Sequence, residues 1–317
     1  MISRAILIPA LAITAGVIAA AAAQDPPPAR FRSSVDAVHV DVQVMSGRRP
    51  VSGLTAADFE LRDSGVVQEI RAVSSGTLPI TLLLALDTSS STAGAMLRHL
   101  KTAAREAVGT LRPDDQAMLI SFANRVSAQA GPTGDRQALG RAIDALEADG
   151  ATALYDAVFT AIAVRERVPG RVVLLLCTDG LDTASWLDAG RVLDAALRSD
   201  VVVYGVSATP LFVASTDREA PLVDARRSAI RRWFGSEPAL FPQGFLEEVA
   251  ERTGGEVVYV RDGRELARVF TRVVGDFQNR YVLSYSPQNV PDSGWHPIEV
   301  RLKNRRGSVQ ARRGYWR

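Results

Sequence analysis

Two long apolar runs are the sequence feature that most restricts how this chain can fold. Residues 80–86 contain a single polar residue, Thr81, and residues 172–176 contain none. A strand with one solvent-exposed face alternates apolar and polar residues, so a continuous apolar run indicates a strand that is covered on both faces. Such strands occur mainly in parallel sheets with helices on both sides. The two runs therefore predict the central strands of an α/β domain.

The residues around these runs alternate between strand-like and helix-like patterns. Apolar residues recur at helical spacing in residues 96–111, 139–146, 154–162, 186–197 and 266–277, and a further helix around Val249 ends at two glycines. Shorter apolar strands occupy residues 118–122, 201–206 and 257–260. Strands that alternate with helices over about 200 residues predict a doubly wound, Rossmann-like and mostly parallel sheet.

The two ends of the chain have β-strand patterns instead. Residues 38–44 alternate apolar and polar side chains, and a second alternating stretch contains Phe59 and Leu61. Three more strand-like stretches lie at 281–285, 298–302 and 308–312. A few strands alone are only marginally stable. We therefore predict that a segment at 32–77 pairs with one at 281–317 in a small β-sandwich, with the α/β domain of residues 78–280 inserted between them.

The N-terminus has the pattern of an export signal. A positive charge at Arg4 precedes an uncharged run of 19 residues, 5–23, that ends in three alanines. This pattern is typical of a cleaved signal peptide at 1–23, which a proline-rich linker at 24–31 follows. An uncleaved membrane anchor is the alternative, because the run is long enough to cross a membrane. We expect an exported protein, periplasmic or secreted, with no membrane span after cleavage.

The overall charge argues against nucleic acid as a partner. The chain has 37 basic and 35 acidic residues and a formal net charge of +2, whereas a nucleic-acid binder carries a dominant basic surface. Its single cysteine, Cys177, allows no internal disulfide. Because Cys177 lies in an apolar strand, we predict a buried and unreactive thiol.

Oxygen-bearing side chains follow both long apolar runs. Asp87, Ser89 and Ser91 come at the end of the first run, where alternate positions let three oxygen atoms converge on one point. Thr152 lies in a later loop that leads into a helix, and Asp179 follows the second run, directly before a glycine. In open α/β sheets, ligands bind at the carboxyl ends of the strands, where the strand order reverses. The sequence therefore predicts that these five side chains share one site.

In these motifs the chain resembles the von Willebrand factor A (VWFA) family and its metal-ion-dependent adhesion site (MIDAS). The family pattern is Asp-x-Ser-x-Ser, then a Thr in a loop, then an Asp before a Gly, and this chain matches all five positions. The resemblance covers roughly residues 78–280. The flanking β segments and the ending Ala-Arg-Arg-Gly-Tyr-Trp at 311–316 look like a bacterial exported group described as VWFA-related.

The resemblance implies that Ser89, Ser91 and Thr152 bind a divalent cation directly, whereas Asp87 and Asp179 act mainly through bound water. All five donors are hard oxygen atoms, which favours Mg²⁺, Mn²⁺ or Ca²⁺ over softer metals. An octahedral ion held in this way keeps one position for an outside ligand, and its neutral hydroxyl ligands keep it electrophilic. We therefore expect a Glu or Asp of a protein partner at that position.

Other polar residues near these motifs are expected to be structural. Asp156 lies in the first turn of a helix and Asp182 follows the turn after the second apolar run, positions typical of helix and loop caps. The three histidines, His39, His99 and His296, have no neighbours at ligand spacing, which predicts surface roles for all of them.

Two segments leave alternatives open. Residues 208–240 form an insertion after the strand at 201–206, where an amphipathic helix is expected and a specificity loop for the acidic partner is the alternative. Residues 301–317 contain seven basic and no acidic side chains. Solvent-facing strand positions account for most of these charges, and an anionic surface partner is the alternative.

These features favour a metal-dependent adhesion module of an exported protein. A scaffold protein whose metal is vestigial or structural is the alternative, and a metal-dependent hydrolase is a third possibility. The sequence contains no Gly-x-Ser-x-Gly motif, no phosphate-binding loop and no His-Glu-x-x-His motif. We therefore predict a binding protein and not an enzyme.

Overall fold

The computed structural model describes residues 37–47, 49–168, 170–178, 182–208 and 242–317. The chain from Asp36 onward forms one compact unit. The predicted signal peptide at 1–23, the linker at 24–31 and all but the first residue of the predicted insertion at 208–240 lie outside the described residues. Within the described part, no helix combines the length and the apolar character that a membrane crossing needs.

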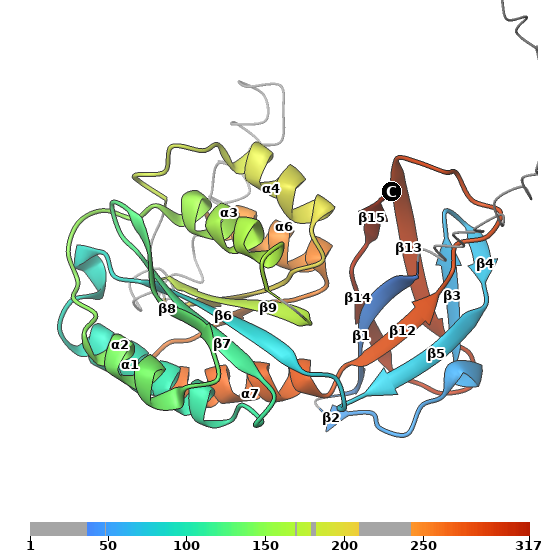
Figure 1. Ribbon diagram of the computed structural model, residues 1–317, viewed down its shortest axis with the longest axis horizontal. Helices are drawn as coiled ribbons and strands as arrows, with labels where there is room; N and C mark the ends of the chain where they lie inside the picture. The colour runs from blue at the N-terminus through green and yellow to red at the C-terminus, as the bar shows by residue number, and fades with distance from the viewer. Residues whose placement is uncertain (1–36, 48, 169, 179–181, 209–241) are drawn as a thin grey trace, which may run out of the picture. The chain divides into compact units, whose positions relative to one another are not determined.

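A six-stranded sheet forms the centre of the α/β domain (Figure 1). Its order is β11-β10-β9-β6-β7-β8, and all neighbouring strands are parallel except the pair of β7 and β8. The strands are β6 (Ile80–Asp87), β7 (Gln116–Phe122), β8 (Val126–Thr133), β9 (Arg171–Thr178), β10 (Val202–Ser207) and β11 (Val257–Tyr259). The two long apolar runs are β6 and β9, which lie side by side in the middle of the sheet.

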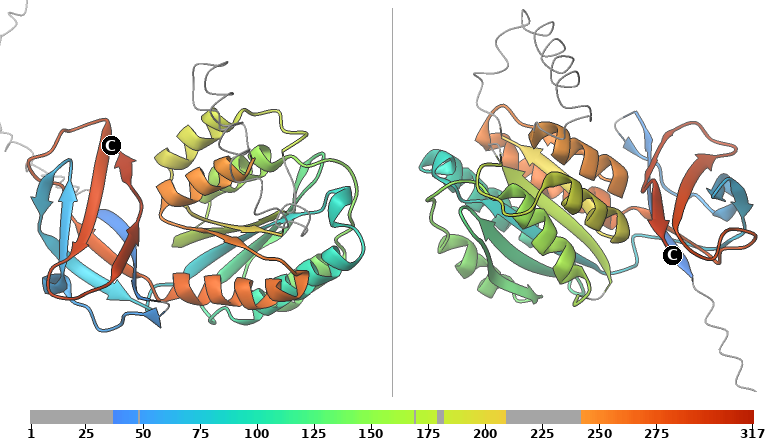
Figure 2. Two further views of the ribbon diagram at one scale, coloured as in Figure 1. Left: turned by 180° about the vertical axis from the view of Figure 1, so that it is seen from behind. Right: turned by 90° about the horizontal axis from the view of Figure 1, so that it is seen from above.

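Helices cover both faces of this sheet (Figures 1 and 2). One face carries α1 (Ala95–Gly109), α2 (Arg136–Asp144) and α7 (Leu266–Gln278), and the other carries α3 (Leu154–Arg165), α4 (Ala189–Arg198) and α6 (Pro242–Thr253). Along β6, Leu82 and Leu84 pack towards the first set of helices, and Leu83 and Ala85 towards the second. The doubly wound architecture predicted from the apolar runs is therefore confirmed.

Two details of the domain differ from the prediction. The edge strand β8 was not expected, because most of its side chains are exposed and the apolar pattern is weak. The helix expected over residues 186–197 begins only at Ala189, since the carboxylate of Asp188 accepts a hydrogen bond from the backbone N–H of Arg191 and caps it. Trp186 therefore lies in a loop.

The β segments from the two ends of the chain pair with each other, as predicted. In one sheet, β1 (Val38–Ser46) lies between β12 (Tyr281–Tyr285) and β14 (Ser308–Ala311), with β5 (Ile70–Ser75) beyond β12 and the short β2 (Arg49–Pro50) beside β1. The second sheet has the order β15-β13-β3-β4, made of β15 (Gly314–Trp316), β13 (Trp295–Leu302), β3 (Phe59–Asp63) and β4 (Val66–Gln68). Apolar side chains of both sheets form one core.

A buried polar network crosses this sandwich, and it corrects the prediction for His296. Instead of lying on the surface, His296 is fully buried in β13, where its Nδ1 hydrogen bonds to Asp63 Oδ1 at 2.9 Å. The hydroxyls of Tyr285 and Tyr315 both donate to Asp63 Oδ2 at 2.8 Å. Asp63 thus joins four strands, β3, β12, β13 and β15, from both sheets. His39, in contrast, is exposed on β1, as predicted.

The surroundings of Asp63 shift the pKa values of Asp63 and of the tyrosines that bond to it. Burial raises the pKa of Asp63, but the hydrogen bonds from Tyr285, Tyr315 and His296 outweigh it, so that the net pKa is lowered. Burial and then the hydrogen bond to Asp63 raise the pKa of Tyr315 to about 12. The network therefore holds a carboxylate and neutral phenols at neutral pH.

Two arginines connect the sandwich to the α/β domain. Arg171, at the start of β9, forms a partly buried ion pair with Asp41 of β1. The buried Arg280 donates from Nη2 to Tyr204 Oη at 2.6 Å and to Gln43 Oε1 at 3.1 Å. These contacts lie at the amino end of β9 and on the strand β10, away from the carboxyl ends of β6 and β9.

Replacing Asp63 by Asn is expected to destabilise the protein at pH 7. The new amide cannot accept from all the donors around it, which costs about 1–3 kcal/mol for each donor left unpaired. Because the folded pKa of Asp63 is lowered, its stabilisation is complete above the ordinary value of 3.8 and is lost as the pH falls through the folded value. The free energy of unfolding, measured with urea from pH 7 to pH 2.5, should therefore depend less on pH in Asp63→Asn than in the wild-type protein.

The exposed Asp292, in the loop before β13, supplies the control. Asp292→Asn should match the wild-type protein at every pH. Equal unfolding free energies for Asp63→Asn and the wild type at pH 7 would contradict this account of the network.

Candidate functional site

The strand order of the central sheet reverses between β6 and β9. From β6 the chain passes through α1 to β7 on one side, and from β9 it passes through α4 to β10 on the other side. The carboxyl ends of these two neighbouring strands therefore lie at the point where the strand order reverses, which is where open α/β sheets bind ligands. The last residues of the two strands are Asp87 and Thr178.

Asp87 is buried at the carboxyl end of β6. Its side chain is 0% exposed. Its Oδ1 accepts a hydrogen bond from the backbone N–H of Ser89 at 2.9 Å, and its Oδ2 accepts one from Thr178 Oγ1 at 2.6 Å. Both carboxylate oxygens are therefore held in place, one by the loop after β6 and one by the end of β9.

The hydroxyls of the two serines of the motif lie close together in the loop after Asp87. Ser89 is buried at 2% exposure, whereas Ser91 is exposed in the 3₁₀ turn η2 (Ser90–Thr92). Their Oγ atoms are 3.0 Å apart, a hydrogen-bonding distance. Adjacent ligands of an octahedral Mg²⁺ are separated by about 2.9 Å, since each Mg–O bond is about 2.0–2.1 Å. The pair of hydroxyls therefore already has a spacing that fits a small octahedral cation.

Backbone hydrogen bonds bring the loop of Thr152 to the same edge. The N–H of Ser90 donates to the carbonyl of Gly150, and the N–H of Gly150 donates to Ser90 Oγ, both at 2.9 Å. The N–H of Asp149 donates to the carbonyl of Thr88 at 2.9 Å. Thr152 is buried at 5% exposure, two residues after Gly150.

Gly150 is required in this loop for two reasons. Its φ of +88° lies in the left-handed region that favours glycine. A Cβ atom there would lie 2.5 Å from the side chain of Asn124, whose Oδ1 accepts from the N–H of Ala151 at 2.8 Å. A larger residue would displace the side chain of Asn124 and disturb its hydrogen bond to Ala151.

Four of the five residues predicted for the site therefore lie on loops that meet at one edge of the sheet: Asp87, Ser89, Ser91 and Thr152. The fifth, Asp179, lies outside the described residues. Its neighbour Thr178 is described and hydrogen bonds to Asp87. Sequence reasoning missed this role of Thr178, because a threonine at the end of a strand has no distinguishing pattern. Cys177 is buried in β9, as predicted.

The structural roles predicted for Asp156 and Asp182 are confirmed. Asp182 Oδ1 accepts from the backbone N–H groups of Leu154 and Tyr155, at 2.8 and 3.2 Å, and so caps the start of α3. The carboxylate of Asp156 accepts from the N–H groups of Trp186 and Leu187, both at 3.0 Å. Burial and then the charge of Asp182 raise the pKa of Tyr155. The loop after β9 is thus tied to the start of α3.

The donor chemistry of this edge fits a hard cation. Among the described residues, no group of three or more His, Cys, Asp and Glu side chains could hold a metal ion. The four described residues of the predicted set offer one carboxylate and three hydroxyls, which suit Mg²⁺, Mn²⁺ or Ca²⁺ better than Zn²⁺ or Cu²⁺.

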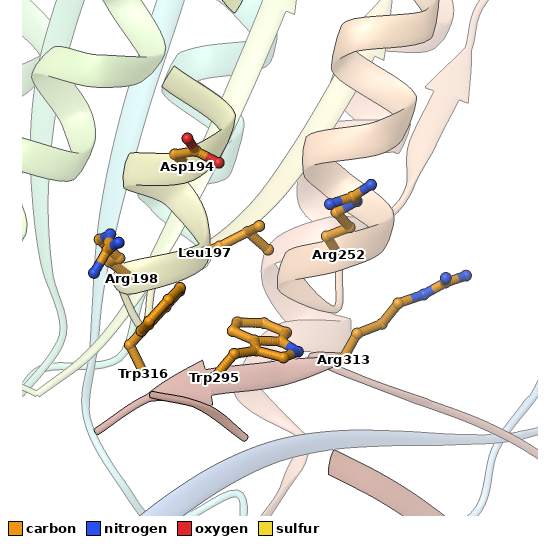
Figure 3. Close-up of a pocket in the computed structure, with 7 residues that line it drawn as sticks. All are labelled: Asp194, Leu197, Arg198, Arg252, Trp295, Arg313 and Trp316. Carbon is orange, nitrogen blue, oxygen red and sulfur yellow. The ribbon is translucent and has the colours of Figure 1, made fainter. Parts of the chain in front are cut away.

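A separate cavity of about 560 Å³ lies at the far end of α4 (Figure 3). Its lining consists of two tryptophans, three arginines, one aspartate and one leucine: Trp295, Trp316, Arg198, Arg252, Arg313, Asp194 and Leu197. The guanidinium of Arg198 stacks on the ring of Trp316, 4.0 Å from its centroid. The helix α4 begins after the loop that is bonded to the start of α3, and its last residues line this cavity. The cavity is therefore remote from the predicted metal ligands.

Replacing Asp182 by Ala is expected to loosen the start of α3 and the loop of Thr152. Loss of a helix cap costs about 0.5–2 kcal/mol. Hydrogen exchange of the amides of Leu154 and Tyr155 should therefore accelerate, as measured by NMR. Asp188→Ala removes the cap of α4 and serves as the control, with no change at Leu154 or Tyr155. Unchanged exchange in Asp182→Ala would refute the assigned cap.

Comparison with known proteins agrees with this fold. Residues 82–181 match the family model of the von Willebrand factor type A domain. A solved structure of a von Willebrand factor type A protein from Catenulispora acidiphila superimposes with a TM-score of 0.50 at 15% sequence identity, covering 84% of this chain and 74% of that one. A comparison with curated protein sequences finds no significant match.

Two other structures are similar at lower scores. The von Willebrand factor domain of the type V pili tip protein Mfa5 from Porphyromonas gingivalis has a TM-score of 0.45 at 11% identity, covering 63% of this chain and 95% of that one. Proximal thread matrix protein 1 from the mussel byssus, with a zinc-occupied MIDAS motif, has a TM-score of 0.48 at 18% identity, covering 68% of this chain but only 49% of that one. The family match of residues 82–181 and the doubly wound sheet agree: this part of the chain has the fold of a von Willebrand factor type A domain.

Proposed function

We propose that this domain binds one divalent cation at the carboxyl ends of β6 and β9, and that the cation binds a carboxylate of a protein partner. The observation that carries the proposal is the arrangement of Asp87, Ser89 and Ser91. Asp87, at 0% exposure, accepts a hydrogen bond from the backbone N–H of Ser89, and the hydroxyls of Ser89 and Ser91 are 3.0 Å apart. A buried carboxylate is unfavourable unless donors or a cation compensate its charge.

The burial of these residues indicates which side of the proposed site faces solvent. Asp87 and Ser89 are buried, whereas Ser91 is exposed. A cation held by this set would have protein on its inner side and solvent on its outer side. The outer coordination position would therefore be available to a partner, and the neutral hydroxyl ligands would leave the ion electrophilic enough to favour a carboxylate there.

Mg²⁺ is the occupant of this proposal, with Mn²⁺ or Ca²⁺ as alternatives, because the predicted ligands are hard oxygen donors. Thr152 and Asp179 would complete the set. The remaining parts of the proposal are that the protein acts outside the cytoplasm and that it binds without catalysing a reaction.

Replacing Asp87 by Ala is expected to abolish Mn²⁺ binding and leave the fold intact. Electron paramagnetic resonance of free Mn²⁺ should give one site for the wild-type protein and at least about 100-fold weaker binding for Asp87→Ala, while circular dichroism stays unchanged. Asp114→Ala supplies the control, because Asp114 is exposed at the opposite end of the sheet, before β7. Wild-type Mn²⁺ affinity in Asp87→Ala would rule the site out.

Selection of random peptides on the immobilised protein tests the partner chemistry. In Mg²⁺ we expect strong enrichment of Glu and Asp at one peptide position, because the outer coordination position favours a carboxylate. The enrichment should disappear in chelator and in Asp87→Ala. If the protein binds Mn²⁺ but selects no acidic residue, a scaffold role with a structural metal replaces the adhesion proposal.

A further inference from the structure

The cavity at the far end of α4 has the size and the lining of a small-molecule site (Figure 3). Its volume of about 560 Å³ lies within the range of about 300–1,000 Å³ that is typical of such sites. The indoles of Trp295 and Trp316 supply ring surface, and three arginines supply positive charge. Among the described residues of the lining, Asp194 alone is acidic. The cavity therefore favours a ligand that combines a flat ring with a negative charge.

Both indoles of the cavity are held in place by their neighbours. Trp295 of β13 and Trp316 of β15 lie opposite each other in an antiparallel pair, with ring centroids 6.2 Å apart and an interplanar angle of 61°. Gly314 makes room for the first ring, since a Cβ atom at this position would overlap the indole of Trp295. Rings that are positioned in advance cost a ligand little ordering entropy on binding.

Arg198 is the cation of the lining that has no counter-charge. Within the described residues it forms no ion pair, although Asp194 lies four residues earlier on α4, a spacing at which such pairs are common. Its guanidinium instead stacks on the ring of Trp316, 4.0 Å from the centroid. A stacked guanidinium uses its flat face, so the N–H groups at its edge can still donate to a carboxylate.

The other two arginines of the lining are already neutralised. Arg252 pairs with Glu248 at 2.6 Å, and Arg313 pairs with Glu251. Figure 3 shows both of them on the side of α6, whereas Arg198 lies beside the ring of Trp316. Arg198 is therefore the group of this lining that a bound anion would neutralise.

Arg198 is also not needed to cap its own helix. A basic residue at the end of a helix often bonds to the last carbonyls. Here the side chain of Arg312 takes that role, because its Nη2 donates to the carbonyls of Leu197 and Ser199 at 3.3 and 3.0 Å. The end of α4 thus leaves the guanidinium of Arg198 available to a ligand.

We propose that this cavity binds a small aromatic carboxylate, whose ring packs against Trp295 and Trp316 and whose carboxylate accepts hydrogen bonds from Arg198. Aromatic rings pair favourably with indoles in offset-stacked or edge-to-face arrangements. The planar fork of an arginine matches a carboxylate with two parallel hydrogen bonds. The proposed cation site at the carboxyl ends of β6 and β9 plays no part in this binding, so either proposal can fail without the other.

Titration with two matched compounds, 2-naphthoate and 2-naphthamide, tests the inference. At pH 7 only 2-naphthoate is charged, and the two have the same ring. NMR of the indole N–H groups should show that 2-naphthoate shifts the signals of Trp295 and Trp316 and leaves that of Trp186 unchanged. The amide should bind the wild-type protein at least about tenfold more weakly, because it cannot form the charge-assisted bonds with Arg198.

Arg198→Gln should lose this preference and bind the two compounds equally weakly. Arg191→Gln is the matched control, because Arg191 is an exposed arginine of the same helix that pairs with Asp188 and is not part of the lining. This variant should keep the wild-type preference. The same preference in Arg198→Gln would overturn the role of Arg198.

The wild-type titration also decides the proposal without any variant. Equal affinity for 2-naphthoate and 2-naphthamide would contradict a site for an anion. Unshifted indole signals of Trp295 and Trp316, or equal shifts of Trp186, would contradict binding in this cavity.

Discussion

The buried carboxylate of Asp87 is the constraint on which the rest of the site depends. A charged group at 0% exposure needs compensation, and the N–H of Ser89 and the hydroxyl of Thr178 hydrogen bond to its two oxygens. In the proposed function, a cation held by the neighbouring hydroxyls adds a counter-charge. Asp87 lies where the strand order reverses, so the buried charge coincides with the place where open α/β sheets bind ligands.

The β-sandwich contacts the α/β domain away from this edge. Among these contacts, Arg171 at the start of β9 pairs with Asp41 of β1, and Arg280 bonds to Tyr204 of β10. Within the sandwich, the Asp63 network joins both sheets. The described contacts of the sandwich therefore lie apart from Asp87 and Thr178 at the carboxyl ends of β6 and β9.

Much of this arrangement could be predicted because burial leaves a local pattern. The apolar runs identified β6 and β9, and the oxygen-bearing residues after them marked the edge of the site. The buried His296 could not be predicted, since its partner Asp63 is more than two hundred residues away in sequence. Strand β8 has mostly exposed residues, and Trp186 was assigned to a helix because the cap at Asp188 was not recognised.

Anomalous diffraction from crystals grown with Mn²⁺ is the most direct test of the central claim. We predict one strong peak at the carboxyl ends of β6 and β9, within bonding distance of the Oγ atoms of Ser89 and Ser91 and adjacent to Thr152. No peak there at saturating Mn²⁺, or a peak only elsewhere on the protein, would contradict the account.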